Sequence, residues 1–336
     1  MTGPLGGQQA GDAVAAVAAA CSGHVGLVAR HLGTGEELSW HPDEAIQTAS
    51  TVKVAVYAEV MRQARIGRVD LGARVATRPD GLAGGSGVLA ILRPGLSCTV
   101  ADLCMLMIAL SDNTATNMLI DLLGGVSEVN RGVASLGYPG IRLDHKVSIP
   151  PPLPPAGPPA QPPPVGTLAS ATAPPSASRA DPPPARPLAT ATPAELCRLL
   201  AGLHAGTVVD RAASEQMITT LRCQRDRSLF PRAYLAVAGA AEPPGPQAPA
   251  LAHKTGCVGG CRADTGLLYL PDGGAVAYCA VADRLADESM TALAEGDEVV
   301  GRLGAVVLAR WWPGPGPVPL RPGWLPRGIS SPAGGR

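Results

Sequence analysis

Segments with the pattern of β-strands lie at both ends of this chain, and segments with the pattern of α-helices lie between them. Apolar runs bounded by turn residues predict strands over 24–32 and 37–42, and again over 265–271 and 275–283. Such strands pair most simply as one antiparallel sheet made from both chain ends, with a mainly helical region inserted between them, so we expect an α+β fold. Helices are predicted near 11–21, 52–65, 99–110, 114–123, 127–136, 193–204, 211–221 and 301–312.

A proline-rich segment interrupts the helical region. Residues 150–187 hold 16 of the 35 prolines and almost no large apolar side chains, so we expect an extended, solvated insertion there and a loose tail over 313–336. The remaining sequence has a length that suits one domain, predicted over 1–312. Its parts are expected to be an α/β part at about 11–45 and 205–312 and a helical part at about 46–204.

Composition and charge exclude several classes of partner. The 27 basic and 27 acidic residues balance, which gives no electrostatic footprint for nucleic acid or an anionic membrane. The N-terminal segment lacks the basic region of a secretory signal, and no apolar run is long enough to span a membrane. We therefore expect a cytoplasmic monomer. A lipoprotein-type cleavage box ending at Cys21 is the alternative.

The eight cysteines are scattered through a chain too large to need disulfides, so most are expected to be free thiols. The run "CVGGC" from Cys257 to Cys261 is the exception, because its Gly-Gly turn allows a small loop or a metal site. No histidine or third cysteine lies near it at the spacing of a zinc motif, so neither a metal nor another cofactor is predicted.

Ser50 and Lys53 lie three residues apart at the start of a predicted helix. This spacing puts both side chains on one face, about a turn apart. A serine hydroxyl is a weak nucleophile unless a base takes its proton, and a lysine can be that base when burial or another cation lowers its pKa. The alternative is a helix-capping serine followed by an ordinary solvated lysine.

Two further polar clusters follow in the sequence. Ser111, Asp112 and Asn113 lie between two apolar helices, where all three types are also good caps. The stretch "HKTGCVGG" places Lys254-Thr255-Gly256 before a predicted turn and strand. An exposed cation and hydroxyl there can anchor a substrate carboxylate, while glycine allows close approach.

The order S-x-x-K, S-D-N and K-T-G resembles the class A β-lactamases and penicillin-binding proteins. The stretches "GGSGVL", "SDNTATNMLI", "RLD" and "TPAEL" extend the resemblance from about residue 11 to 312. It implies a β-lactamase-like fold of the DD-peptidase and transpeptidase type, in a single catalytic domain. It also implies that Ser50 is acylated, that Lys53 belongs to its proton network, and that Ser111 relays a proton to the leaving nitrogen.

The same resemblance implies how a substrate would be held. Asn113 would hold a substrate amide, and Lys254 and Thr255, followed by Gly256, would bind its carboxylate. The backbone N–H groups of Ser50 and Cys257 would form the oxyanion hole.

One departure from the family pattern bears on turnover. In class A β-lactamases the "RLD" is followed, after two further residues, by a glutamate that activates the deacylating water. Val147 stands at that place here, and there is no glutamate between Glu128 and Glu195. Deacylation must then use another group or be slow. Asp181, in the proline-rich segment, is one alternative group, although a carboxylate on a flexible loop is poorly preorganised.

Other residues near these motifs have structural alternatives. Asp144 is expected to pair with Arg142, and His145 and His253 are expected to pack or hydrogen-bond rather than act as bases. Arg262 and Asp264 are expected to touch the substrate or to pair with each other.

The sequence thus predicts a β-lactamase-like serine hydrolase that forms an acyl-enzyme on Ser50. Its expected substrate is a small molecule, a β-lactam or a related cyclic amide or ester with a carboxylate, in antibiotic resistance or biosynthesis. Two alternatives remain open: a cytoplasmic esterase, amidase or acyltransferase of a biosynthetic pathway, and a β-lactam sensor that acylates without turnover.

Overall fold

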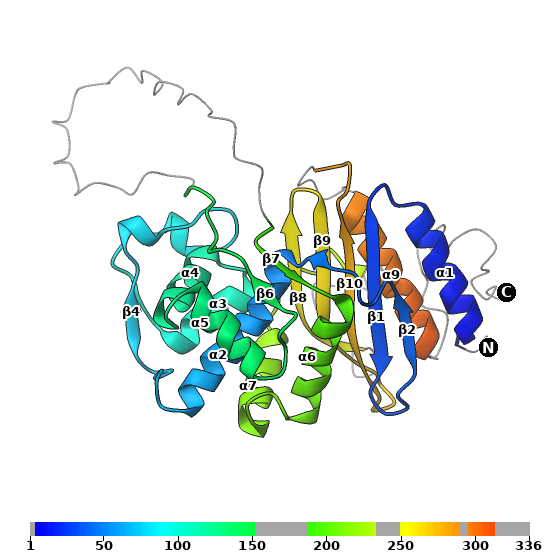
Figure 1. Cartoon of the computed structure of the whole chain (residues 1–336), viewed down its shortest axis with the longest axis horizontal. Helices are drawn as coiled ribbons and strands as arrows, with labels where there is room; N and C mark the ends of the chain where they lie inside the picture. The colour runs from blue at the N-terminus through cyan, green and yellow to red at the C-terminus, as the bar shows by residue number, and fades with distance from the viewer. Residues whose placement is uncertain (1–3, 152–186, 233–248, 289–294, 313–336) are drawn as a thin grey trace, which may run out of the picture.

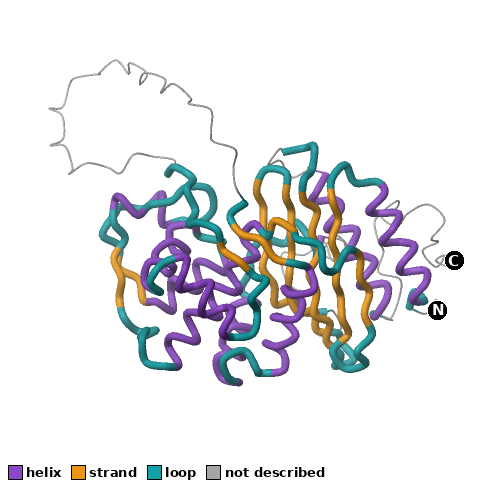
Figure 2. Tube along the Cα trace, viewed as in Figure 1, coloured by secondary structure: helices purple, strands orange, loops and turns teal. Residues whose placement is uncertain are grey.

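A computed structural model of the chain describes residues 4–151, 187–232, 249–288 and 295–312. The rest of the proline-rich segment, Asp181 and the tail over 313–336 lie outside the described residues. The described chain forms a sheet layer with helices on both of its faces, joined to a helical half (Figures 1 and 2).

The predicted sheet from both chain ends is present. Five strands lie in the order β2-β1-β10-β9-β8, and every neighbouring pair is antiparallel. All nine residues of β10 are buried, as expected for a central strand of a sheet covered on both faces. The strands are β1 (His24–His31), β2 (Glu37–Trp40), β8 (Ala250–Val258), β9 (Cys261–Tyr269) and β10 (Ala275–Asp283).

Helices from the two chain ends cover one face of the sheet. α1 (Gly7–Ala19) packs against α9 (Glu295–Trp311), and their apolar residues form one core with the adjacent face of the strands (Figure 1). α6 (Pro193–Ala205) packs on β10, β9 and β1, and its apolar side chains belong to the second core. Thr192 caps α6 by accepting a hydrogen bond from the Glu195 N–H at 3.1 Å.

The helical half is built around α2 (Lys53–Arg65). Nearly every residue of this helix is buried, because other helices contact it from several sides. The N-terminal part of a helix surrounded in this way has no solvated face on which to place a charge, and the exposed Arg65 lies at the C-terminal end. Lys53 is consequently buried at the first residue of α2. The contacting helices are α3 (Val100–Ala109), α4 (Asn113–Leu122), α5 (Val126–Ser135) and α7 (Arg211–Leu221).

Short elements complete the described chain. β3 (Ile46–Gln47), β7 (Ala189–Ala191) and β6 (Arg142–Leu143) form a small antiparallel sheet, and β4 (Arg74–Ala76) pairs with β5 (Ser97–Thr99). Three short 3-10 helices are η1 (Ala49–Val52), η2 (Pro79–Gly81) and η3 (Leu89–Ile91).

The K-T-G segment precedes a turn and a strand, as predicted, but it also lies in a strand that the sequence analysis did not predict. Lys254, Thr255 and Gly256 lie inside strand β8. The turn falls after Val258, which pairs with Cys261 across the hairpin. Four polar or glycine residues in succession, 253–256, hid the strand, because the alternation of apolar and polar residues that identifies strands is absent there.

Candidate active site

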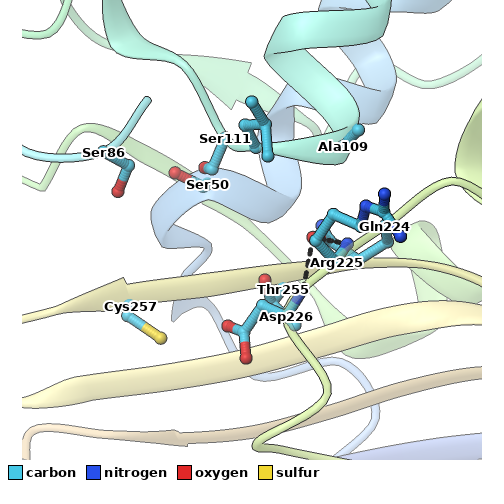
Figure 3. A pocket seen from close by; sticks show the side chains of 10 residues that line it. Ser50, Ser86, Ala109, Ser111, Gln224, Arg225, Asp226, Thr255 and Cys257 are labelled. Carbon is cyan, nitrogen blue, oxygen red and sulfur yellow. Dashed lines mark hydrogen bonds between the residues drawn. The ribbon is translucent and has the colours of Figure 1, made fainter. Parts of the chain in front are cut away.

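The three sequence clusters meet at one pocket of about 320 Å³. The nucleophile predicted at Ser50 lies on one side of it and the edge strand β8 on another (Figure 3). Four of the eight predicted site residues line the pocket, and the other four lie behind this lining. The pocket is lined by Ser50, Ser86, Ala109, Leu110, Ser111, Gln224, Arg225, Asp226, Thr255 and Cys257.

Ser50 belongs to η1, which continues directly into α2. It does not cap α2, because Val52 occupies that position and no side chain caps the helix. Gly256 on β8 lies very close to Ser50: a Cβ atom added to it would come within 2.9 Å of the Ser50 backbone nitrogen. Glycine is thus needed for β8 to approach η1.

Lys53 is fully buried, and its amino group donates hydrogen bonds to three acceptors. Its Nζ donates hydrogen bonds to the Ser111 carbonyl at 2.8 Å, to Ser111 Oγ at 3.1 Å and to Asn113 Oδ1 at 2.8 Å. Burial lowers the pKa of Lys53 well below its ordinary value, the charge of Lys254 lowers it further, and Asp112 opposes the shift. The solvated lysine of the alternative reading is therefore excluded. A buried amine with a lowered pKa can take a proton from a neighbouring hydroxyl.

Asp112 connects this lysine network to the segment "GGSGVL". It caps α4 by accepting from the Ala115 N–H at 2.9 Å, and its second oxygen accepts from the N–H groups of Val88 and Leu89 at 2.7 and 2.9 Å. Gly87 (φ 102°) passes so close that an added Cβ would come within 2.3 Å of an Asp112 oxygen. Ser86 is thereby held at the pocket rim.

Asn113 is also committed to this framework. Its Oδ1 accepts from Lys53, its Nδ2 donates to the Gly84 carbonyl at 2.8 Å, and its backbone N–H donates to the Ser86 carbonyl. The side chain is 5% exposed and is not among the residues that line the pocket. Asn113 thus orients Lys53 and the loop containing Ser86.

Lys254 is not the exposed cation that the sequence predicted. It is fully buried, and its Nζ donates to the Thr255 carbonyl at 2.7 Å. Burial lowers its pKa to about 8, against the opposing charge of Asp226. Thr255, the next residue of the motif, lines the pocket, whereas Lys254 does not.

The cysteines of "CVGGC" are free thiols, as are the other six. Cys257 lines the pocket, and burial raises its pKa to about 12, so its thiol stays protonated at neutral pH. Cys261 is buried and its thiol donates to the Gln47 carbonyl at 3.2 Å. The hairpin turn between them therefore closes without a disulfide.

Three side-chain pairs near the motifs are resolved. Asp144 accepts from Arg142 at 3.2 Å, as predicted. Of the two alternatives for Arg262 and Asp264, pairing with each other is wrong, and neither residue lines the pocket. Residues two apart on a strand place their side chains on the same face, but each of these residues has another partner: Arg262 pairs with Asp297 at 2.9 Å, and Asp264 with His253 at 3.0 Å.

Val147 lies apart from Ser50, at a second pocket that is bordered by α4. Its backbone is held at both ends by Asn117, which accepts from its N–H at 2.9 Å and donates to its carbonyl at 2.8 Å. His145 is close by in the sequence, and its Nδ1 contacts the Lys146 carbonyl at 2.7 Å. Neither residue lines the pocket at Ser50.

The sequence analysis missed the loop that follows α7. Gln224 anchors it by donating to the Ile108 carbonyl at 3.0 Å and by accepting from two backbone N–H groups of the loop. The loop places Asp226 in the pocket, where it is the only acidic side chain among the described lining residues (Figure 3). One Asp226 oxygen accepts from the Ser228 N–H and hydroxyl at 3.0 and 2.7 Å. The cluster of charges in "QRDRS" was the available signal.

Within the described ranges, no helix combines the length and the apolar character that crossing a membrane requires.

Comparisons with known proteins agree with this geometry. The family model described as "Beta-lactamase enzyme family" matches residues 9–311. A beta-lactamase of Rhodobacter capsulatus is 35% identical over 133 residues, which make up 40% of this chain and 45% of that protein. The chain thus aligns with less than half the length of this curated relative.

Solved structures match over nearly the whole chain. The beta-lactamase from Sphaerobacter thermophilus DSM 20745 has a TM-score of 0.69 and 29% identity, with 90% of this chain and 97% of that chain covered. A mutant of PBP-A in an acyl-enzyme complex with penicillin G has a TM-score of 0.66 and 24% identity, with 90% and 94% covered. An ancestral class A beta-lactamase has a TM-score of 0.68 and 22% identity, with 89% and 99% covered. The last two likenesses concern the fold alone.

Proposed function

The chain belongs to the beta-lactamase enzyme family, and from this premise we propose that it is a serine hydrolase whose nucleophile is Ser50. Its substrate is a β-lactam or a related cyclic amide or ester that carries a carboxylate. The observation that carries the proposal is the burial of Lys53 with its Nζ at 3.1 Å from Ser111 Oγ, which lines the same pocket as Ser50, and with the pKa of Lys53 lowered well below the ordinary value. A lowered pKa makes the neutral amine available as a proton acceptor for the pocket hydroxyls.

The proton path follows from the three bonds at Lys53. A neutral amine keeps two N–H donors, which suffice for the Ser111 carbonyl and Asn113 Oδ1, and its lone pair then faces the pocket hydroxyls. Lys53 takes the proton of Ser50 as Ser50 Oγ bonds to the carbonyl carbon. When the C–N bond breaks, that proton passes through the Ser111 hydroxyl to the leaving nitrogen. The product is an ester of Ser50.

Charge that develops on the carbonyl oxygen needs donors that are already in place. The backbone N–H groups of Ser50 and Cys257 are the proposed pair, supported by the close approach of Gly256 to Ser50. Thr255 and the charge of Lys254 bind the substrate carboxylate. Because Lys254 is buried, it also keeps the pocket electropositive and depresses the pKa of Lys53.

Deprotonation of Lys53 and deprotonation of Lys254 should change the acylation rate in opposite directions as the pH rises. The rate should rise as Lys53 loses its proton, and for substrates with a carboxylate it should fall above about pH 8, because Lys254 loses its charge there. An activated ester without a carboxylate should show the rise but not the fall. Stopped-flow acylation rates across the pH range measure both limbs, and a fall at the same pH for both substrates would remove this role from Lys254.

A second candidate function is acylation without efficient turnover. It is favoured by Val147, which stands at the family's glutamate position and lines a different pocket from Ser50. Asp226 is the acidic group that the described pocket lining offers, but one of its oxygens is occupied by Ser228. An Asp226 carboxylate that is engaged by Ser228 in this way is poorly placed to activate the deacylating water. The esterase and acyltransferase alternatives share Ser50 and differ in the acyl acceptor.

We expect burst kinetics from this arrangement. A chromogenic cephalosporin should give one rapid turnover per chain, followed by a steady rate at least tenfold slower, because deacylation lacks a preorganised base. Adding small amines or alcohols separates the alternatives: an acyltransferase speeds up with acceptor concentration, and a sensor does not. A linear progress curve without a burst would mean that deacylation is fast and that another group serves it.

The direct test of the nucleophile compares two serines of the same pocket. Ser50→Ala should lower hydrolysis of the cephalosporin and of the ester by roughly 10⁴-fold or more, because covalent catalysis is lost. Ser86→Ala is the matched control, since Ser86 also lines the pocket and should retain activity within about tenfold. Equal rates for wild type and Ser50→Ala would refute the proposal.

A further inference from the structure

Two histidines and a glutamate meet at the end of strand β1, away from the pocket at Ser50. His24 is the first residue of β1, and His41 and Glu44 lie in the segment that follows β2. None of the three lines the pocket at Ser50. Their ligand-type atoms all lie within 4.8 Å of one another.

The separations of these atoms match a metal coordination sphere. His24 Nε2 lies 2.7 Å from Glu44 Oε2 and 3.1 Å from His41 Nδ1, and His41 Nδ1 lies 3.6 Å from Glu44 Oε1. Ligands bonded to zinc at about 2.0 to 2.1 Å in a tetrahedron lie about 3.3 Å apart. The two nitrogens and one of the two Glu44 oxygens, which all lie within 4.8 Å of one another, therefore need only small side-chain adjustments to surround one ion.

A buried carboxylate fixes the orientation of His24. Asp283 Oδ1 lies 3.1 Å from His24 Nδ1, and Asp283 is 3% exposed. A proton on Nδ1 satisfies this contact and leaves the lone pair of Nε2 directed at His41 and Glu44. Metal-binding histidines characteristically donate their second N–H to a carboxylate in this way, which raises the basicity of the ligating nitrogen. Asp283 also accepts from the Gln47 N–H at 3.0 Å, which holds it in place.

Ring stacking fixes His41 in turn. Its ring stacks between those of Trp40 and His24, with centroids 5.1 Å apart in both pairs. Its Nδ1 lies 3.1 Å from Nε2 of His24. Two imidazole nitrogens and a carboxylate oxygen converge at distances where lone pairs repel, so a cation or shared protons must lie between them.

We propose that His24 Nε2, His41 Nδ1 and a Glu44 oxygen form a binding site for Zn²⁺ or a similar borderline divalent metal. Nitrogen ligands disfavour Mg²⁺ and Ca²⁺, which take oxygen. The side chains of His41 and Glu44 are 43% and 56% exposed, which leaves an entry path for the ion. The fourth position is open to water or to a ligand from outside. The competing occupant is a proton: a charged His24 paired with Glu44 and Asp283.

Titration calorimetry with Zn²⁺ on the full chain, under reducing conditions after treatment with a chelator, tests the site. Wild type should bind one ion, and His41→Ala and Glu44→Gln should each weaken binding by about a hundredfold. Asp283→Asn should weaken Zn²⁺ binding by about ten- to hundredfold, which is the usual effect of losing a carboxylate that hydrogen-bonds to a metal-binding histidine. His204→Ala, at an exposed histidine on α6, is the matched control and should bind as wild type does.

Two further readouts keep the test decisive. Zn²⁺ should raise the unfolding temperature of wild type and His204→Ala but not of His41→Ala, because an ion that binds only the folded state stabilises it. Co²⁺ should give a tetrahedral absorption spectrum without a thiolate charge-transfer band, which separates this site from the free cysteines. Failure of wild type to bind Zn²⁺, or equal binding by His41→Ala and Glu44→Gln, would overturn the proposal and leave the proton as the occupant.

Discussion

Replacing Lys53 with methionine is expected to slow acylation by about 10²- to 10⁴-fold, which is the usual contribution of a positioned proton acceptor. Methionine fills a similar volume and removes a charge that burial penalises, but it leaves the Ser111 carbonyl and Asn113 Oδ1 without the Lys53 donor. Urea denaturation of the variant therefore separates lost chemistry from lost stability. Intact-protein mass spectrometry of the acylated fraction against time measures the acylation rate.

Lys53→Arg is the informative partner variant. Arginine keeps the positive charge but does not give up its proton in proteins. If Lys53 acts as a base, the arginine variant should be as slow as the methionine variant. If Lys53 acts only through its charge, the arginine variant should acylate much faster than the methionine variant. Acylation by Lys53→Met within tenfold of wild type would contradict a catalytic role altogether.

Replacing Asp112 with alanine is expected to lower the free energy of unfolding by about 3 kcal/mol or more, since each buried donor left without an acceptor costs about 1 to 3 kcal/mol. Three backbone N–H groups lose their acceptor at once, those of Val88, Leu89 and Ala115. Asp112→Asn keeps one acceptor oxygen and should cost less. Urea denaturation of the two variants gives the comparison.

The same substitution should alter the pH dependence. Asp112 raises the pKa of Lys53, so its removal lets that pKa fall further and shifts the rising limb of acylation to lower pH. If the rising limb of the acylation rate lies at the same pH in wild type and in both Asp112 variants, Asp112 has a structural role only. Unfolding free energies within about 1 kcal/mol of wild type would contradict the capping account itself.

Much of the fold could be predicted because its signals are local. The apolar runs of β1 and β10 identify strands without any knowledge of their partners, and the Ala-rich and Leu-rich periods identify α1, α3 and α6. That the strands of the two chain ends share a sheet followed from their separation by helices. Strand β8 was not predicted, because its buried polar residues serve the site and break the pattern.

The candidate site was only partly predictable. The order of S-x-x-K, S-D-N and K-T-G indicated Ser50, Lys53 and Ser111, which the structure brings together. Burial could not be read from the motif, so Lys254 was expected at the surface although the sheet covers it fully. Asp226 lies in the pocket because Gln224 ties its loop to the Ile108 carbonyl, and no local sequence pattern predicts that long-range hydrogen bond.

The cluster of His24, His41 and Glu44 illustrates the same limit. Zinc motifs are recognised by short, regular spacings, and here only His41 and Glu44 are close in the sequence, whereas His24 is remote. They meet because β1 and β2 pair, and because Asp283, contributed by the far end of the chain, orients His24. Such sites depend on sheet register and become visible only once the strands are placed.

The measurement that tests the central claim most directly is the location of the acyl group. Wild type is mixed with a penicillin or cephalosporin, quenched in acid while the burst lasts, digested, and mapped by mass spectrometry. The account predicts one acyl group per chain, on the hydroxyl of Ser50, and none in Ser50→Ala. An adduct on Ser86, Ser111 or Cys257, or substrate turnover without any adduct on Ser50, would contradict it.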